Sequence, residues 1–301
     1  MSAAPHLFTL TGNLLAERTL EFADWQVGRT QRAVRETFHT RGKGVNVSNL
    51  LARLGAPTTA LIFAGGAPGA ESEAWLRRRG IAYQAFATQA ASRTGTVIWS
   101  DRQAETTFLG PDVPPDAAAV SACATWLDTQ ADRQVLALCG SFPGWNEAAF
   151  DPLRAVLRRW AQRGVLVADA YGPPLGWLAQ LPLALVKINR QEFDAFRPGA
   201  GDMAARLRQA GDELPVQVWI VTDGPGSLWL ALPGERPREF HPPVLREVSP
   251  TGSGDVFLGA LLHGRWHLGL GWPEAIAYAL PFAAANAAHP GVADFELPVT
   301  N

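Results

Sequence analysis

The stretch Pro250-Thr251-Gly252-Ser253-Gly254-Asp255 leads directly into the apolar run 256–262, VFLGALL, which is typical of a buried helix. Its two glycines allow a tight turn in which successive N–H groups converge at a helix start. Such a terminus binds anions, because its N–H groups are unpaired and the helix dipole is positive there. Asp255 would repel a bound phosphate, but it is well placed to accept a proton from a hydroxyl that attacks the phosphate. The alternative is an ordinary helix start with Ser253 or Asp255 as the N-cap.

On the N-terminal side of this stretch, short apolar segments that favour strands alternate with segments that favour helices. The expected core strands are 6–11, 59–63, 134–139, 164–169, 183–188 and 216–222. The expected helices are 45–54, 71–79, 116–129, 147–162 and 203–210, followed by 254–267 and 273–288. This alternation predicts an α/β fold in which helices cover both faces of a mostly parallel sheet.

Two segments do not follow the strand-helix alternation. Glu17–Thr40 and Ser92–Phe108 are more polar and rich in residues that favour strands, with clear alternation in 93–99, RTGTVIW. We expect them to form a small separate sheet that covers a cleft at the carboxyl ends of the main strands, where open α/β sheets bind ligands. No linker or repeat interrupts the chain, so residues 1–301 are expected to form one domain with this lid.

The composition fits a globular enzyme and excludes several other classes. Hydrophobic residues make up 47% of the 301 residues and charged residues 18%, which is ordinary for such a protein. A net charge of −2 gives no reason to expect nucleic acid or an acidic membrane as a partner. The two cysteines, Cys123 and Cys139, lack the spacing of a metal site or a disulfide framework.

The chain also shows no targeting or membrane-spanning signal. Residues 1–20 have neither a basic start nor a continuous apolar core, so we expect no signal peptide. No uninterrupted apolar stretch reaches about 18 residues, the minimum for a membrane helix. With its reduced cysteines, the protein is expected in the cytoplasm.

Three further segments combine glycine, charge and polar side chains at predicted element ends. The first, Arg41-Gly42-Lys43-Gly44-Val45-Asn46-Val47, is a cationic turn into a helix, and its alternative is a surface turn. In the second, Lys187-Ile188-Asn189-Arg190-Gln191-Glu192, two oxygen-bearing side chains one helical turn apart suit Mg²⁺, although the segment taken alone favours a helix cap by Asn189. The third, Val221-Thr222-Asp223-Gly224-Pro225-Gly226, either holds a nucleotide or only reverses the chain.

The order of these motifs resembles that of the PfkB (ribokinase-like) carbohydrate kinase family over essentially the whole chain. Residues 41–47 are similar to the Gly-Gly-Lys-Gly-x-Asn-Val turn of the fructose-1-phosphate and tagatose-6-phosphate kinase branch. The segments Gly140-Ser141-Phe142-Pro143 and Ser92-Arg93-Thr94 resemble that family's Gly-Ser-Leu-Pro turn and Thr-Arg lid strand. The resemblance implies a three-layer α/β/α fold with a small β-lid, which in many members is also a dimer interface.

The resemblance also implies a role for each matching residue. It implies Asp255 as the catalytic base, with an anion hole formed by the amides of Gly252, Ser253 and Gly254. It places ATP and Mg²⁺ as cofactors, the metal being positioned by Asn189 and Glu192. The implied nucleotide-binding residues are Lys187, Thr222, Gly224, Gly226, Thr251 and Asn286. The implied residues for the sugar substrate are Glu17, Gly42, Lys43, Asn46, Arg93 and Ser141, of which Lys43 and Arg93 would bind a phosphate already on the sugar.

The positions at which the chain departs from the family pattern lie mainly where the sugar that accepts the phosphoryl group would bind. Glu17 stands where the branch has a sugar-binding aspartate, and Arg41 replaces the first glycine of the cationic turn. The expected activity is ATP-dependent phosphorylation of a ketohexose monophosphate such as fructose 1-phosphate or tagatose 6-phosphate. The expected partners are this sugar, the nucleotide and a second copy of the chain through the lid. The alternatives are a kinase for an unphosphorylated sugar or nucleoside, and an inactive homologue that only binds a sugar phosphate.

Overall fold

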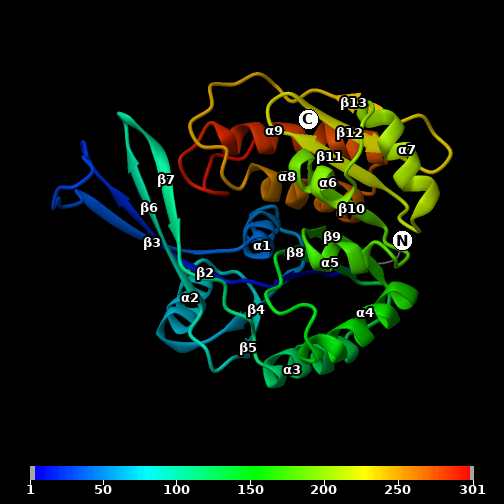
Figure 1. The fold of residues 1–301 in the computed structure, drawn as a ribbon, viewed down its shortest axis with the longest axis horizontal. Coiled ribbons are helices and arrows are strands. Elements are labelled where there is room, and N and C mark those ends of the chain that lie inside the picture. The colour runs from blue at the N-terminus through cyan, green and yellow to red at the C-terminus, as the bar shows by residue number, and fades with distance from the viewer. Residues whose placement is uncertain (1–3, 299–301) are drawn as a thin grey trace.

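The computed structural model describes residues 4–298 of the 301-residue chain. Within them, a main sheet of nine strands has the order β13-β12-β11-β10-β9-β8-β1-β4-β5 (Figure 1). The strands from β5 to β11 run parallel, whereas β12 and β13 extend the sheet in antiparallel fashion. The strand bounds are β1 (Leu7–Thr11), β4 (Thr58–Ala64), β5 (Tyr83–Ala87), β8 (Val135–Gly140), β9 (Val165–Ala170), β10 (Leu185–Asn189), β11 (Trp219–Asp223), β12 (Ser227–Ala231) and β13 (Arg238–Phe240).

Helices cover both faces of this sheet. One face carries α1 (Lys43–Arg53), α2 (Gly66–Arg78), α8 (Ser253–Leu262) and α9 (Trp272–Ala287). The other carries α3 (Ala117–Asp128), α4 (Asp151–Arg163), α5 (Pro173–Leu178), α6 (Arg190–Phe196) and α7 (Met203–Glu213). In β1, for example, Phe8 and Leu10 pack toward the second group and Leu7 toward the first. Burial on both faces explains why the parallel strands are almost continuously apolar.

Helix α8 lies between α1 and α9. Its residues from Asp255 to Leu262 are all buried, as expected for a helix that is apolar on every side. Gly259 permits the close approach of α8 to α1, since a Cβ at this position would lie 3.2 Å from the Val47 carbonyl oxygen. The packing therefore fixes the N-terminus of α8 beside that of α1.

A second sheet projects from the body (Figure 1). It contains β2 (Leu15–Glu21), β3 (Arg35–Arg41), β6 (Arg93–Ser100) and β7 (Gln103–Leu109) in the order β3-β2-β6-β7. These strands lie within or at the ends of the two segments that were predicted to form a separate sheet. We call this four-stranded sheet the lid.

The structure confirms the predicted α/β fold. All six predicted core strands lie in the main sheet, and every predicted helix overlaps a helix of the structure. The strands β5, β12 and β13 were missed because they are partly exposed and lack the continuous apolar run of the central strands. The helices α5 and α6 were missed because six or seven residues are too few to show a helical period. Among the helices of residues 4–298, none combines the length and apolar character that crossing a membrane requires.

Candidate active site

The N-terminus of α8 has the tight turn that the sequence predicts. Gly252 is the N-cap with a φ of 74°, in the left-handed region that favours glycine. A Cβ at Gly252 would lie 2.3 Å from Val292 Cγ1, so a side chain has no room there either. No side chain caps α8 among the described residues, and the alternative of a Ser253 or Asp255 cap is therefore wrong.

Two of the three amides predicted to form an anion hole are free. Within residues 4–298, the N–H groups of Gly252 and Gly254 have no hydrogen-bond acceptor. The N–H of Ser253 instead donates to the Pro250 carbonyl oxygen at 3.2 Å, which closes the turn. The anion hole predicted from three amides therefore lacks the amide of Ser253 in this structure, and the amides of Gly252 and Gly254 remain as donors for an anion.

Asp255 is buried at this helix terminus, with 7% of its surface exposed. Asn46 on α1 donates from Nδ2 to Asp255 Oδ2 at 2.7 Å and so orients the carboxylate. Burial and the nearby Asp169 raise the pKa of Asp255 to about 6, against the opposing effect of Lys43 and Lys187. A carboxylate with this pKa is mostly ionised at neutral pH and is basic enough to accept a proton.

A network of buried charges lies beside Asp255. Asp169, at the end of β9, is fully buried and accepts hydrogen bonds from Lys43 Nζ at 2.9 Å and from Lys187 Nζ at 3.0 Å. Burial alone would raise the pKa of Asp169, but the two lysines hold it below its ordinary value. The sequence analysis missed this residue, although a carboxylate at the carboxyl end of a central strand is a recognisable signal.

Lys43 lies beside two carboxylates of the charged cluster, Asp169 and Glu192. Its Nζ also donates to Glu192 Oε1 at 3.0 Å, and it lines the same cavity as Asp255. Burial would lower the pKa of Lys43, but Asp169 and Glu192 outweigh this effect and raise it. In this structure Lys43 pairs with carboxylates from β9 and α6, and its contact with the sugar's phosphate stays a prediction.

Asn189 and Glu192 form a capping box at the start of α6. Asn189 Oδ1 accepts from the Glu192 N–H at 2.8 Å, and Glu192 Oε2 accepts from the Asn189 N–H at 2.9 Å. The helix-cap alternative is therefore confirmed. Residues 4–298 contain no cluster of three or more acidic, histidine or cysteine side chains arranged to hold a metal. Mg²⁺ does not need such a cluster, because it typically binds one or two carboxylates, substrate phosphates and water.

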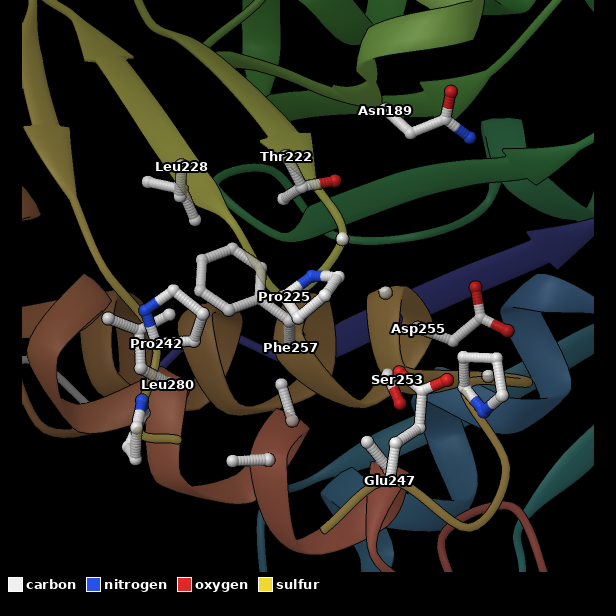
Figure 2. Close-up of a pocket in the computed structure, with 18 of the residues that line it drawn as sticks. Asn189, Thr222, Pro225, Leu228, Pro242, Glu247, Ser253, Asp255, Phe257 and Leu280 are labelled. Atoms are coloured by element: carbon white, nitrogen blue, oxygen red, sulfur yellow. The ribbon is translucent and has the colours of Figure 1, made fainter. Parts of the chain in front are cut away.

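A cavity of about 450 Å³ connects this charged centre to an apolar end. Lys43, Lys187, Asn189 and Asp255 line the charged end. Figure 2 shows Asp255 and Ser253 on one side of the cavity and Leu228, Pro242 and Leu280 on the other. The volume suits a small ligand with a charged and an apolar end.

The residues that the resemblance assigned to the nucleotide fall into two groups. Lys187, Thr222 and Gly224 line this cavity. The side chain of Asn286 is fully buried and hydrogen-bonds to Thr251 O, Ser253 Oγ and the Ala293 N–H, so it positions the α8 turn.

Thr251 and Gly226 also lie outside the lining. Thr251 faces the lid, where its Oγ1 donates to Glu105 Oε1 at 3.1 Å. The N–H of Gly226 donates to the Asp223 carbonyl oxygen at 3.1 Å and so closes the turn after β11. Thr251, Gly226 and Asn286 thus each have a structural contact in the chain, and their contact with the nucleotide stays a prediction.

A second cavity, of about 290 Å³, lies between the lid and the segment 289–294. Glu17 and Arg41 line it and form a buried ion pair, with 3.1 Å between Glu17 Oε1 and Arg41 Nε. Thr251 and Glu105 line the same cavity. Glu17 and Arg41, two positions at which the chain departs from the pattern that it resembles, thus pair with each other.

The remaining predicted substrate residues meet near the base of the lid. Asn13 Nδ2 donates to Ser141 Oγ at 3.2 Å and to Asp112 Oδ1 at 2.7 Å. Arg93 Nη1 donates to the same Asp112 oxygen at 2.9 Å. Arg93 Nε is buried and has no hydrogen-bond partner among the described residues. The sequence analysis missed Asp112, which has no motif around it.

Gly42 shapes the start of α1. Its φ is 132°, and a Cβ there would lie 2.5 Å from Thr11 Cγ2. A side chain at Gly42 would therefore displace α1 from β1. Its role in the structure is to bring Lys43 and Asn46 to the carboxyl ends of the strands.

Comparison with known proteins supports a carbohydrate kinase. The family model described as "pfkB family carbohydrate kinase" matches residues 15–299. A 1-phosphofructokinase of Rhodobacter capsulatus is 29% identical over 289 residues, covering 91% of this chain and 88% of that protein. A D-tagatose-1-phosphate kinase of Bacillus licheniformis is 26% identical over 296 residues, covering 96% and 94%.

Solved structures show the same fold. Phosphofructokinase-2 from Escherichia coli in complex with fructose-6-phosphate has a TM-score of 0.84 at 19% identity, with 94% of each chain covered. Ribokinase from Thermotoga maritima has a TM-score of 0.73 at 17% identity, with 96% of this chain and 95% of that chain covered. At these identities the likeness concerns the fold and does not extend to the substrate.

Proposed function

Because this chain belongs to the PfkB family of carbohydrate kinases, we propose that it transfers the γ-phosphoryl group of ATP to a hydroxyl of a ketohexose monophosphate. The observation that carries this proposal is the buried Asp255 at the free N-terminus of α8, with two lysines beside it. The named relatives favour a ketohexose 1-phosphate, either fructose 1-phosphate or tagatose 1-phosphate. Tagatose 6-phosphate remains a candidate acceptor for the same assay.

In the proposed reaction, Asp255 takes the proton of the attacking hydroxyl. The oxygen then forms a bond to the γ-phosphorus while the bond to the bridging oxygen of ADP breaks. The free amides of Gly252 and Gly254 donate to the oxygens of the transferred group, and Lys187 and Lys43 offset their negative charge. Burial of these groups strengthens each of these interactions relative to water.

Glu192 and Asn189 are the residues that would hold Mg²⁺ at the charged end of the cavity. The metal would supply charge neutralisation between the phosphates of the nucleotide. Asn189 lines this end of the cavity, and Glu192 lies next to it, where its carboxylate accepts hydrogen bonds from Lys43 Nζ and from the Asn189 N–H.

We expect Glu192→Gln to raise the Mg²⁺ concentration needed for half-maximal activity, because a charged oxygen near the phosphates is lost. Asn189→Ser separates the roles, since serine keeps the helix cap but removes the amide. The measurement is a Mg²⁺ titration of initial rates at fixed nucleotide, with thermal unfolding of each variant as the control. An unchanged titration in Glu192→Gln, with or without loss of stability, would leave these residues with the capping role alone.

We also propose that the lid closes over the sugar, which would exclude water from the transfer. Glu105 on β7 already accepts from Thr251 Oγ1 and lies 3.3 Å from Ser249 Oγ, next to the α8 turn. The exposed side chains of Val27, Phe108 and Leu109 fit the expected contact with a second copy of the chain.

Hydrogen exchange should slow in β2, β3, β6 and β7 when a sugar phosphate and a non-hydrolysable nucleotide analogue are added together. The expectation follows from closure, which shields the lid amides from water. The exposed helix α7 serves as an internal control, because it packs on the opposite side of the main sheet from α8. Equal exchange in the lid with and without ligands would contradict a lid that closes.

A second candidate is a kinase for a free sugar. Arg93, which was predicted to bind the sugar's phosphate, and Arg41 of the cationic turn are each paired with a carboxylate, from Asp112 and Glu17 respectively. Both cations are thus at least partly neutralised before any substrate binds. An assay of sugar phosphates and free sugars with ATP and Mg²⁺ decides between the two candidates.

A further inference from the structure

The free N–H of Gly252 belongs to a peptide group whose carbonyl oxygen is held by a side chain. This peptide joins Thr251 to Gly252, and Asn286 Nδ2 on α9 donates to Thr251 O at 2.9 Å. The C=O and N–H of a trans peptide lie in one plane and point in opposite directions. A bond that fixes the carbonyl therefore also fixes the direction in which the Gly252 N–H points.

The side-chain amide of Asn286 is itself bonded in one orientation. Its Oδ1 accepts from the Ala293 N–H at 2.8 Å, while its Nδ2 donates to Thr251 O and to Ser253 Oγ. The reversed orientation would place a donor against the Ala293 N–H and an acceptor against Thr251 O, leaving both backbone groups unpaired. The side chain is fully buried, so bulk water does not compete for these bonds.

The next group is the peptide between Val292 and Ala293. Its N–H is the donor to Asn286 Oδ1, and its carbonyl oxygen accepts from Arg41 Nη1 at 3.3 Å. Ala293 has a φ of 55°, in the left-handed region that is uncommon for residues other than glycine. Such a conformation persists where neighbouring contacts hold it, and it occurs preferentially at functional sites.

Arg41 thus supplies a positive charge at one end of a chain of amide groups. We call this series the amide chain: the 292–293 peptide, the Asn286 side-chain amide and the 251–252 peptide. Each member accepts a hydrogen bond at its oxygen and donates from its nitrogen, and the last donor is the free N–H of Gly252. Hydrogen bonds in such a chain polarise one another, so a cation at one end strengthens the donor at the other.

We propose that Arg41 is a positioning residue for phosphoryl transfer, which acts through the amide chain to orient and polarise the Gly252 amide. The proposal rests on the proposed kinase function and adds a residue to its machinery. A donor that is already oriented needs no reorganisation during the reaction. Removing a whole donor of this kind lowers kcat by about 10²–10³-fold, so weakening one should have a smaller effect, roughly 3–30-fold.

The test compares Glu17→Gln with the double variant Glu17→Gln/Arg41→Met. Arg41→Met alone would leave the buried carboxylate of Glu17 without its partner, which is strongly destabilising. The two variants share the change at Glu17, so the difference between them isolates the guanidinium.

We expect the double variant to have a kcat about 3–30-fold lower than Glu17→Gln, with the KM values of nucleotide and acceptor within about twofold. Such a pattern is typical of an interaction made only in the transition state. An equal kcat in the two variants overturns the proposal. A higher acceptor KM without a fall in kcat also overturns it, because Arg41 would then contact the acceptor itself.

The amide resonance of Gly252 tests the amide chain without turnover. Labelling threonine carbonyls with ¹³C and glycine amides with ¹⁵N selects the Thr-Gly pairs, which are 11–12, 94–95 and 251–252. Polarisation of a peptide changes the electron density at its nitrogen. The Gly252 cross-peak should therefore move in Glu17→Gln/Arg41→Met relative to Glu17→Gln.

Arg18→Met is the matched control for the loss of a lid arginine. Arg18 also pairs with carboxylates, but it follows Glu17 in β2 and so lies on the opposite face of the lid. We expect its kcat and its Gly252 cross-peak to match those of the wild type. A Gly252 cross-peak that stays in place in the double variant, or that moves equally in Arg18→Met, overturns the proposal.

The two measurements separate this proposal from the proposed function. If the wild type phosphorylates no acceptor, the proposed function fails, but a Gly252 cross-peak that moves as expected still supports the action of Arg41 on this amide. If an acceptor is phosphorylated and neither kcat nor the cross-peak responds to Arg41, the proposed function stands and the role of Arg41 is overturned.

Discussion

Replacement of Asp255 by asparagine is expected to lower kcat by about 10²–10⁴-fold, the usual effect of losing a general base. The amide has the shape of the carboxylate, so nucleotide binding should stay near the wild-type value. The physical reason lies in the site, where Asn46 orients a carboxylate that is buried between two free amides and two lysines. The measurement is steady-state turnover together with calorimetric binding of ADP.

Asp194→Asn is the matched control for this variant. Asp194 is an exposed carboxylate on α6 that pairs with Arg206, and its loss should leave kcat unchanged. If Asp255→Asn kept more than about a third of wild-type turnover, well outside the range for a general base, the assignment of Asp255 as the base would be wrong.

The pH dependence of kcat/KM should reflect the titration of Asp255. Burial and Asp169 raise the pKa of Asp255 to about 6. Only the deprotonated carboxylate accepts a proton, so activity is low below this pKa and rises as the pH increases through about 6. The acidic limb should therefore lie near pH 6 in the wild type. A limb near the ordinary aspartate pKa of about 4 would mean that Asp255 is less buried during the reaction than in this structure.

Local sequence patterns were sufficient to predict the fold and the α8 turn. The parallel strands are apolar on both faces, and the glycines and the carboxylate of 252–255 lie within one turn of the same helix. The amides, the base and the helix terminus are therefore fixed by residues that are neighbours in the chain. Local patterns of this kind are visible without a structure.

The orientation of the lysines could not be predicted in the same way. The sequence shows Lys43 at the start of a helix, but the side chain turns toward Asp169, which lies 126 residues later on β9. A buried ammonium group goes to the carboxylates that stabilise its charge, and such partners are set by tertiary packing. The contacts of Asn286 could not be predicted for the same reason, since its hydrogen-bond partners come from the α8 turn and from the C-terminal segment.

Arg93 and Lys43 have different surroundings, so variants of the two residues can test whether the acceptor sugar carries a phosphate. Arg93 lies in the lid beside Asn13 and Asp112, and its buried Nε has no partner among the described residues. A dianionic phosphate would satisfy this donor and compete with Asp112 for the rest of the guanidinium. Lys43, in contrast, pairs with Asp169, beside the proposed base.

We therefore expect wild type to prefer fructose 1-phosphate or tagatose 1-phosphate over the free sugars, and Arg93→Met to reduce that ratio of kcat/KM by about tenfold or more. A hydrogen bond to a charged group contributes about 1.5–3 kcal/mol, which corresponds to this factor.

Lys43→Met should lower kcat with every acceptor and leave the ratio nearly unchanged, because its charge acts on the transferred group. Arg159→Met, at an exposed arginine paired with Asp128, is the control for loss of a surface charge. If wild type prefers a free sugar, the second candidate function replaces the first. If Lys43→Met alone reduces the ratio, Lys43 must leave Asp169 when the sugar phosphate binds.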